Sequence, residues 1–281
     1  GFGDELDSEG NPAAADVLDL SGLHDADGNP IDLSDVKIRA DVDEWDNKYA
    51  VISFPNGEEL WMRDVDPDSL TPSRLNGMGI PCFCAGTMIR TPDGDVAVED
   101  LRVGDLVETR DNGARPIRWI GGRALDRVDL TMVPKLRPIR IRAGALGQDL
   151  PSRDLMVSPQ HRVLVRSAIA QRMFGTTEVL VAARQLTALD GVDEVAVDSV
   201  QYYHILFARH EIVFSNDAQT ESLYTGPQAM KSLGLAAQDE IFTLFPELRA
   251  GPSEPARPFV PGGKAQKMVQ RHRRNGKTLV C

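Results

Sequence analysis

Cysteine is scarce in this chain. Only three cysteines, Cys82, Cys84 and Cys281, occur among its 281 residues, too few for the disulfide framework of a small secreted scaffold. A zinc site would need further ligands at a recognisable spacing, which the sequence does not supply. A bridge between Cys82 and Cys84 would be strained, because the two residues lie only two positions apart in an expected strand. We therefore expect reduced thiols, no metal and no cofactor.

Long apolar runs are missing as well. No hydrophobic stretch of the chain approaches the ~20 residues of a membrane-spanning helix, so we expect no membrane span. The first residue is glycine, and no signal-peptide pattern follows it. The residues alone therefore leave the localisation open.

Basic residues are rare in the first part of the chain. Residues 1–81 hold 19 acidic and 5 basic residues, a net charge of −14, whereas the remaining 200 hold 23 acidic and 26 basic residues, a net charge of +3. An acidic module does not attract nucleic acid, which selects a basic surface, so we expect no nucleic-acid partner. The change in charge indicates a domain boundary near residue 80.

The hydrophobic pattern predicts an all-β protein with a short helical tail. Alternating runs at 116–120 and 137–142 belong to a series of short strands typical of a closed or horseshoe-like β-unit. The run 180–186 suits a strand that enters a helical turn. Helical spacing appears at 228–233, 239–245 and 264–272.

The acidic part of the chain has its own β pattern. Strands are expected at 17–20, 36–42, 49–54 and 59–65, the last two joined through Asn56-Gly57, a strong hairpin signal. Four parts follow from these patterns: a disordered or tethering segment 1–15, a small acidic β-rich module with its linker 16–81, a β-unit 82–225 and a helical tail 226–281. Residues 25–32 resemble part of a calcium loop but lack its closing glutamate, and turn chemistry explains them.

Three sequence blocks carry the functional information. Residues 82–89 read CFCAGTMI, and 98–107 read VEDLRVGDLV. Residues 155–161 read LMVSPQH, and a late strand pair reads YHILF at 203–207 and HEIVF at 210–214. In this order the blocks resemble the Hint domain of hedgehog proteins, inteins and bacterial intein-like proteins, nearest to the Hint_2 type. The resemblance implies a horseshoe-shaped β-unit and self-cleavage, and it implies a bacterial, exported protein.

The substrate expected from this resemblance is the chain's own N-terminal flank. Cys82 adjoins the carbonyl of Pro81, so attack by its sulfur would convert the Pro81–Cys82 peptide into a thioester, an N-to-S acyl shift. Well-oriented intramolecular reactions reach effective molarities on the order of 10⁵ M, about 7 kcal/mol, without a substrate-binding site. Water or a small nucleophile would then release the acyl group. The reaction would be a single-turnover self-cleavage, and the protein partner is not defined by the sequence.

The Ser-x-x-His block supplies two further candidate residues. Imidazole titrates near neutrality and acts as both acid and base, so His161 is the expected proton donor to the amine that leaves. Ser158 offers a hydroxyl to the scissile peptide or to the imidazole. In an isolated sequence this pattern would more often be a turn and a buried structural histidine, but the Cys-Phe block beside it reverses that preference.

Three residues have more open roles. His204 occupies the late block, where inteins usually place Asp, Asn or Cys, and strand alternation puts it on the face opposite Tyr203 and Ile205. It is equally compatible with a place in the site and with a structural one. His210 is a secondary candidate, as is Cys84, which either exchanges with the thioester or is a small buried residue.

Two departures from the family pattern limit the activity. Residues 216–222 lack the terminal His-Asn pair through which inteins release their C-terminal flank, so we do not expect protein splicing. Pro81 restricts the rotation of the scissile unit and is expected to slow cleavage. The alternatives are a catalytically weak Hint scaffold in a secreted binding or adhesion protein, and a calcium-dependent adhesive module.

Overall fold

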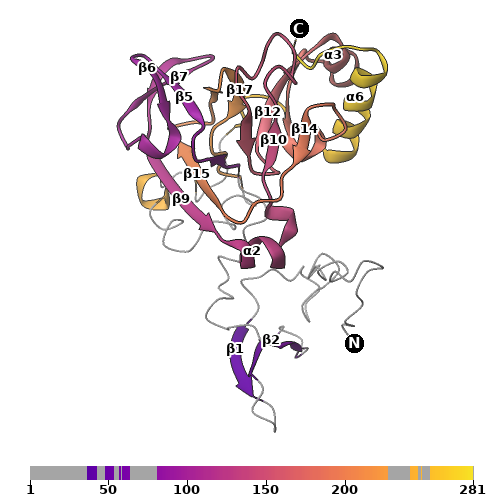
Figure 1. The fold of residues 1–281 in the computed structure, drawn as a ribbon. Helices are drawn as coiled ribbons and strands as arrows, with labels where there is room; N and C mark the ends of the chain where they lie inside the picture. The colour runs from indigo at the N-terminus through magenta and orange to yellow at the C-terminus, as the bar shows by residue number, and fades with distance from the viewer. Residues whose placement is uncertain are drawn as a thin grey trace.

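The computed structural model describes residues 37–42, 48–53, 57, 59–63, 81–226, 241–245, 248 and 254–280. Within these ranges the chain is mostly antiparallel β-structure with few helices (Figure 1). The expectations for 1–15, 17–20, 25–32 and 228–233 lie outside the described residues. No helix of the described part is long and apolar enough to cross a membrane.

A three-stranded antiparallel sheet forms from the acidic part of the chain. Its order is β1 (Lys37–Val42), β2 (Lys48–Ser53) and β3 (Glu59–Arg63). Ser53 pairs with Glu59 across the turn, and Gly57 in that turn has a φ of 84°, a conformation that side chains disfavour. The strands predicted at 36–42, 49–54 and 59–65 and the hairpin are confirmed along their described residues.

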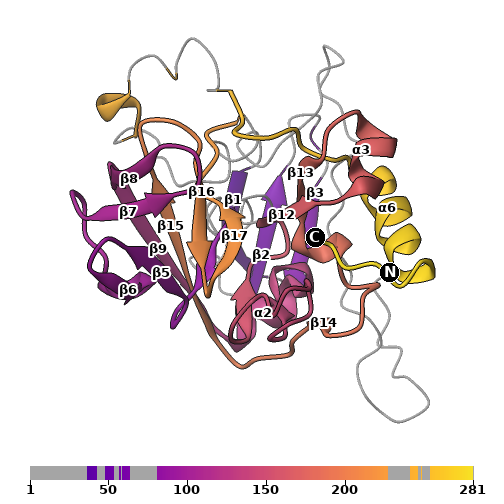
Figure 2. The same cartoon turned by 90° about the horizontal axis from the view of Figure 1, so that it is seen from above.

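Two larger antiparallel sheets form the rest of the β-structure (Figure 2). The six-stranded sheet has the order β14 (Val192–Glu194), β10 (Ile139–Ile141), β11 (Leu155–Val157), β4 (Phe83–Cys84), β15 (Val200–Leu206), β9 (Trp119–Leu125). The eight-stranded sheet has the order β13 (Glu178–Ala182), β12 (Arg162–Arg166), β17 (Ala218–Glu221), β16 (Ile212–Ser215), β5 (Met88–Thr91), β6 (Gly94–Ala97), and β7 (Leu106–Thr109) joins β16 to β8 (Gly113–Pro116). Neither sheet closes into a barrel along the described strands.

Short helical elements connect the strands. Three are single 3-10 turns, and three are α-helices: η2 (Val98–Asp100), η3 (Pro134–Leu136), η4 (Ala183–Gln185), α2 (Arg127–Met132), α3 (Ala168–Phe174) and α6 (Gly262–Arg274). The predicted strand and helical turn at 180–186 are confirmed by β13 and η4, and the helix predicted at 264–272 is confirmed by α6. Residues 241–244 are helical within the predicted 239–245.

The expectation of one strand at 116–120 is wrong. The chain leaves β8 of the eight-stranded sheet at Pro116 and enters β9 of the six-stranded sheet at Trp119. The two residues between bond to different sheets: Ile117 N–H donates to Asp105 O at 2.9 Å, and Arg118 N–H donates to Leu206 O at 2.8 Å. The apolar alternation therefore reflects a crossing between two sheets, which periodicity alone does not distinguish from a continuous strand.

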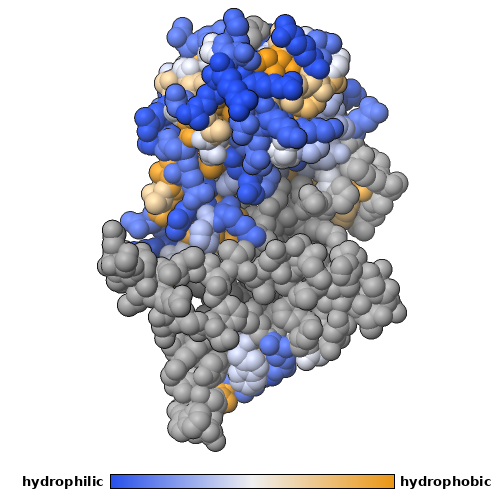
Figure 3. All heavy atoms as spheres, turned by 90° about the vertical axis from the view of Figure 1, so that its right-hand side faces the viewer, coloured by the Kyte–Doolittle hydropathy of each residue, from blue (hydrophilic) through white to orange (hydrophobic). Residues whose placement is uncertain are grey.

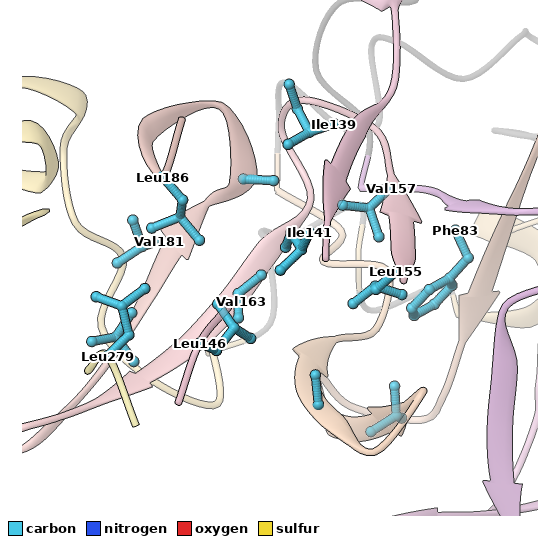
Figure 4. Packing of buried hydrophobic residues seen from close by; sticks show 14 of the residues in the cluster. Phe83, Ile139, Ile141, Leu146, Leu155, Val157, Val163, Val181, Leu186 and Leu279 are labelled. Atoms are coloured by element: carbon cyan, nitrogen blue, oxygen red, sulfur yellow. The ribbon is translucent and has the colours of Figure 1, made fainter. Parts of the chain in front are cut away.

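The six-stranded sheet is buried on both faces. Side chains on one face pack in the main core, and those on the other face pack in a second cluster. Phe83 and Ile205 point into the main core, which also contains Leu155 and Val157 (Figure 4). Cys84 and Tyr202 point to the other face, into a second cluster with Cys82, Trp119 and Leu206. Because side chains alternate along a strand, His204 of β15 shares the second face, opposite Tyr203 and Ile205 as predicted.

The first block forms a turn that its own residues close. Gly86 adopts a φ of 80°, which glycine tolerates, and its N–H donates to the Glu99 carboxylate at 2.9 and 3.0 Å. The prediction that the motif glycines lie at turns is confirmed here and at Gly104, whose φ is 97°. The turn fixes the direction of the short strand β4 that carries the cysteines.

The core extends into the C-terminal part of the chain. Helix α6 lies beside α3 (Figures 1 and 2), and Ala265, Met268, Val269 and Leu279 belong to the main cluster. On the face shown in Figure 3, by contrast, the described residues are mostly hydrophilic and the apolar ones occupy small separate areas.

Candidate active site

Side chains hold both polar atoms of the peptide between Pro81 and Cys82. The carbonyl oxygen of Pro81 lies 2.9 Å from Nδ1 of His204. The N–H of Cys82 donates to Ser158 Oγ at 2.9 Å. Ser158 N–H in turn donates to the Cys82 carbonyl at 3.0 Å. The peptide that the sequence marks as scissile is thus held from both sides by residues far away along the chain.

The contacts of His204 define its tautomer. A carbonyl oxygen only accepts hydrogen bonds, so Nδ1 of His204 carries the proton and donates to Pro81 O. Nε2 is then the acceptor, and Cys82 Sγ lies 3.7 Å from it, so the thiol S–H donates to this nitrogen. The neutral imidazole of His204 therefore contacts both the Cys82 thiol and the Pro81 carbonyl oxygen.

Burial sets the resting protonation of this group. Cys82 is 6% exposed, and burial raises the pKa of its thiol to about 12, against opposing effects of the Ser158 hydroxyl and the charge of Arg123. Burial lowers the pKa of His204 to about 4, although its hydrogen bond to Pro81 opposes this shift. At neutral pH the site therefore contains a thiol and a neutral imidazole, the states that a proton transfer from sulfur to nitrogen requires.

A tight turn carries the Ser-x-x-His block. His161 N–H donates to Ser158 O at 3.0 Å, and the turn is attached to η4 because Ala183 N–H donates to His161 O at 2.8 Å and Arg184 N–H donates to Pro159 O at 3.0 Å. The imidazole of His161 packs edge-on against Phe83, with ring centroids 4.4 Å apart. This places His161 beside the residue that follows Cys82.

The imidazole of His161 is buried and has no hydrogen-bond partner of normal geometry at either ring nitrogen among the described residues. Burial lowers its pKa to about 4; Glu221 opposes this shift, Arg162 and His204 add to it, and the Cys82 carbonyl opposes it. An unpaired buried ring nitrogen is costly in a purely structural histidine. The Cys82 carbonyl lies near this ring without a hydrogen bond of normal geometry to it.

The family model of the Hint domain (Hint_2) matches residues 81–227, just over half of the 281 residues. The chain belongs to the Hint domain family. The match begins at Pro81 and includes Ser158 and His204, whose side chains bond the peptide described above.

The chain is also similar to solved structures of a bacterial intein-like domain and of an intein. The solution structure of a bacterial intein-like domain from Clostridium thermocellum is 15% identical, with 50% of this chain and 97% of that chain covered and a TM-score of 0.32. The crystal structure of the gp41-1 intein is 11% identical, with 50% and 97% covered and a TM-score of 0.31. No curated protein matches the sequence. Hint domains are autoprocessing domains, so the family fixes the general class of chemistry.

The two secondary candidates lie differently in the Hint domain. Cys84 is a free thiol, 4% exposed, on the same face of β4 as Cys82, and burial raises its pKa. His210 packs against Tyr224 and Phe259 rather than against the scissile peptide. Its Nδ1 accepts from Ala256 N–H at 3.0 Å, and its Nε2 lies 3.4 Å from Glu221.

The stretch that lacks the intein His-Asn pair has a structural task. Asn216 and Asp217 form the turn between β16 and β17, with φ values of 45° and 66°. The Asn216 side chain accepts from Met88 N–H at 2.9 Å and donates to Asp154 O at 2.9 Å. This amide is therefore bonded at both ends within the Hint domain.

Two charged residues near the site carry no motif signal. Arg123 of β9 pairs with Tyr202 of β15. Its positive charge opposes the rise in the Cys82 pKa caused by burial and adds to the lowering of the His204 pKa. Glu221 ends β17 and is fully buried. Glu221 lies in the stretch 216–222, whose only predicted feature was the missing His-Asn pair. Among the described residues, no group of three or more His, Cys, Asp or Glu is placed to hold a metal ion.

Proposed function

We propose that this Hint domain cleaves its own chain at Pro81–Cys82 by an N-to-S acyl shift, without protein splicing. The observation that carries the proposal is the position of His204, whose two ring nitrogens lie 3.7 Å from the Cys82 sulfur and 2.9 Å from the Pro81 oxygen. The substrate is the segment that ends at Pro81, and the acceptor is water or a small nucleophile.

The first step forms the carbon–sulfur bond. The thiol proton moves to Nε2 of His204 while Sγ attacks the Pro81 carbonyl carbon, and the carbonyl electron pair moves onto oxygen. Nδ1–H of the same ring, now part of an imidazolium, donates to the oxygen as its charge grows. Prior ionisation is unfavourable because burial raises the thiol pKa and lowers the imidazole pKa, so transfer and attack proceed together. Donors preorganised at a developing oxyanion typically contribute about 3–4 kcal/mol.

The second step breaks the peptide bond. The carbonyl re-forms, the carbon–nitrogen bond breaks, and its electron pair stays on the Cys82 nitrogen, which takes a proton from the imidazolium form of His161. Ser158 Oγ already accepts from this nitrogen at 2.9 Å and keeps it in place. His161, which is neutral at rest because burial lowers its pKa, has taken this proton from water and returns to the neutral ring, and His204 releases the thiol's proton to water. The cycle therefore gains and loses no proton.

The absence of splicing is supported by the Asn216 amide, which holds β5 and the loop at Asp154. Cyclisation of an asparagine needs a free side-chain amide next to the bond it breaks, and this one is bonded on both sides. The products of the proposed reaction are therefore two pieces, divided before Cys82.

The experiment is incubation of the purified protein with and without a small thiol, followed by mass measurement of the fragments. We expect a fragment that ends at Pro81, bearing the added thiol as a thioester, and a fragment that begins with Cys82. An intact chain after long incubation, with the fold retained, would mean a scaffold without this activity. Cleavage at another bond would equally overturn the proposal.

A further inference from the structure

Glu221 is a fully buried carboxylate beside the site. Its Oε1 accepts from the backbone N–H of Arg162 at 2.8 Å, and its two oxygens each lie 3.1 Å from Nη1 of the same arginine. Arg162 directly follows His161. The carboxylate therefore binds the backbone N–H of the residue that follows His161, whose imidazole packs against Phe83.

Two partners keep this carboxylate ionised. Burial acts to raise the pKa of Glu221, but the polar contact with His210 and the charge of Arg162 lower it, and the net shift is downward. Because Nδ1 of His210 accepts from Ala256 N–H, its Nε2 carries the proton, and this nitrogen lies 3.4 Å from Glu221 without the geometry of a normal hydrogen bond. A buried charge with such partners is a fixed negative charge at neutral pH.

A segment outside the matched residues completes the arrangement. The guanidinium of Arg162 stands 4.0 Å from the ring centroid of Phe259, a cation–π contact. Phe259 also packs edge-on against Tyr224, with ring centroids 4.9 Å apart. Residues 256–259 therefore hold both partners of Glu221.

The surroundings of His161 contain one negative charge that favours its protonated form. The charged or titratable groups that face the ring are Glu221, Arg162 and His204, together with the Cys82 carbonyl. Arg162 and protonated His204 both oppose a second positive charge. Without Glu221, the imidazolium that must protonate the Cys82 amine would have only the carbonyl to favour it.

We propose that Glu221 is a positioning residue for this reaction, whose buried charge stabilises the imidazolium form of His161 as the Pro81–Cys82 bond breaks. This inference rests on the proposed function. The carboxylate exchanges no proton: the proton passes from His161 to the Cys82 nitrogen, and the electron pair of the broken bond stays on that nitrogen. Glu221 acts only through its field and through the hydrogen bond to the Arg162 N–H.

The test compares Glu221→Gln with Glu211→Gln. Glutamine removes the charge and keeps an oxygen for the Arg162 N–H. Glu211 is the matched control, because it is also buried, at 2% exposure, but its carboxylate accepts from Asn112 Nδ2 at 2.8 Å instead. Thiol-induced cleavage is measured from pH 5 to pH 8, and the imidazole signal of His161 is titrated by NMR in a Cys82→Ala background, which keeps the chain intact.

We expect Glu221→Gln to slow cleavage at pH 7 on the order of 10- to 100-fold, from one charge lost several Å away in a medium of effective dielectric constant about 20. The deficit should stay nearly constant from pH 8 to pH 5, because the His161 pKa of about 4 lies below this range, and the His161 pKa should fall. Glu211→Gln should match the parent in both measurements. A folded Glu221→Gln variant with the parent's rate and the parent's His161 pKa would overturn the proposal.

Two arrangements keep the outcome decisive. If Glu221→Gln does not fold, the titration is followed in the Cys82→Ala chain alone, and a Glu221 carboxyl signal that does not respond to the protonation of His161 would refute the role. If the parent itself does not cleave, the proposed function fails, while the NMR titration still tests the coupling between Glu221 and His161.

Discussion

Nδ1 of His204 and the carbonyl oxygen of Pro81 lie 2.9 Å apart. The imidazole therefore donates a hydrogen bond to this carbonyl in the intact chain. Since the other ring nitrogen faces the thiol, proton uptake at Nε2 strengthens the hydrogen bond at Nδ1 through the same ring. In the proposed reaction, base and oxyanion donor are therefore one residue.

His204→Gln should slow thioester formation by the ~10²–10⁴-fold typical of a lost general base. Glutamine still donates to a carbonyl but does not take the thiol's proton. His272→Gln is the matched control, since this histidine is also buried and contacts Ser167 at 3.0 Å on the other side of the unit. Cleavage followed by mass spectrometry measures both rates. Equal rates for the two variants would assign His204 a structural role only.

His161→Ala should also slow thioester formation, by ~10²–10⁴-fold, because the Cys82 amine loses its proton donor. Folding should survive, because neither ring nitrogen of His161 makes a hydrogen bond of normal geometry to the described residues. Thiol-induced cleavage and thermal melting are measured together. Parental cleavage in a well-folded variant would leave His204 as the sole proton carrier.

Cys82 should be required for cleavage, whereas Cys84 should not. Cys82→Ala should abolish cleavage, whereas Cys84→Ala should retain most of it, because only the Cys82 sulfur lies near both His204 and the adjacent carbonyl. Fragment yield after incubation with thiol gives the comparison. Loss of cleavage in both variants, with both folded, would contradict this division.

Pro81→Gly should accelerate cleavage. The proline ring fixes its own backbone angle, and glycine removes this restriction on the carbonyl that must become tetrahedral. The measurement is the initial rate of thiol-induced cleavage relative to the parent. An unchanged or lower rate would show that Pro81 is not what limits the reaction.

The stability of the fold should fall as the pH decreases from about 6.5 to about 4. Burial lowers the pKa values of His161 and His204 from 6.5 to about 4. Between these two pH values both histidines are therefore protonated in the unfolded chain but neutral in the folded chain. Each histidine contributes a slope of up to about 1.4 kcal/mol per pH unit, with stability rising with pH. Urea unfolding of Cys82→Ala at several pH values measures the slope. Adding His204→Gln should reduce it, and an unaltered slope would contradict the assignment.

The sequence predicted the parts of the site that local motifs encode. Cys82, Ser158 and His161 follow from blocks whose spacing is short, and the face of His204 follows from strand alternation. Arg123 and Glu221 were missed because their proximity comes from pairing between distant strands, which no short pattern records. The break between Pro116 and Trp119 was missed for a related reason, since a chain that moves between two buried sheets keeps the alternation of a single strand.

The main core draws on residues well beyond the matched range. Met268, Val269 and Leu279 pack in the same cluster as Phe83, and Leu279 lies near Val181 and Leu146 in Figure 4. The match itself ends at residue 227. During synthesis, the bond at Pro81–Cys82 therefore exists long before the residues that complete the packing around it have been added. A nascent chain carries Cys82 in an unfinished domain, and in the proposed reaction translation of the C-terminal segment sets the earliest moment at which a fully packed site can act.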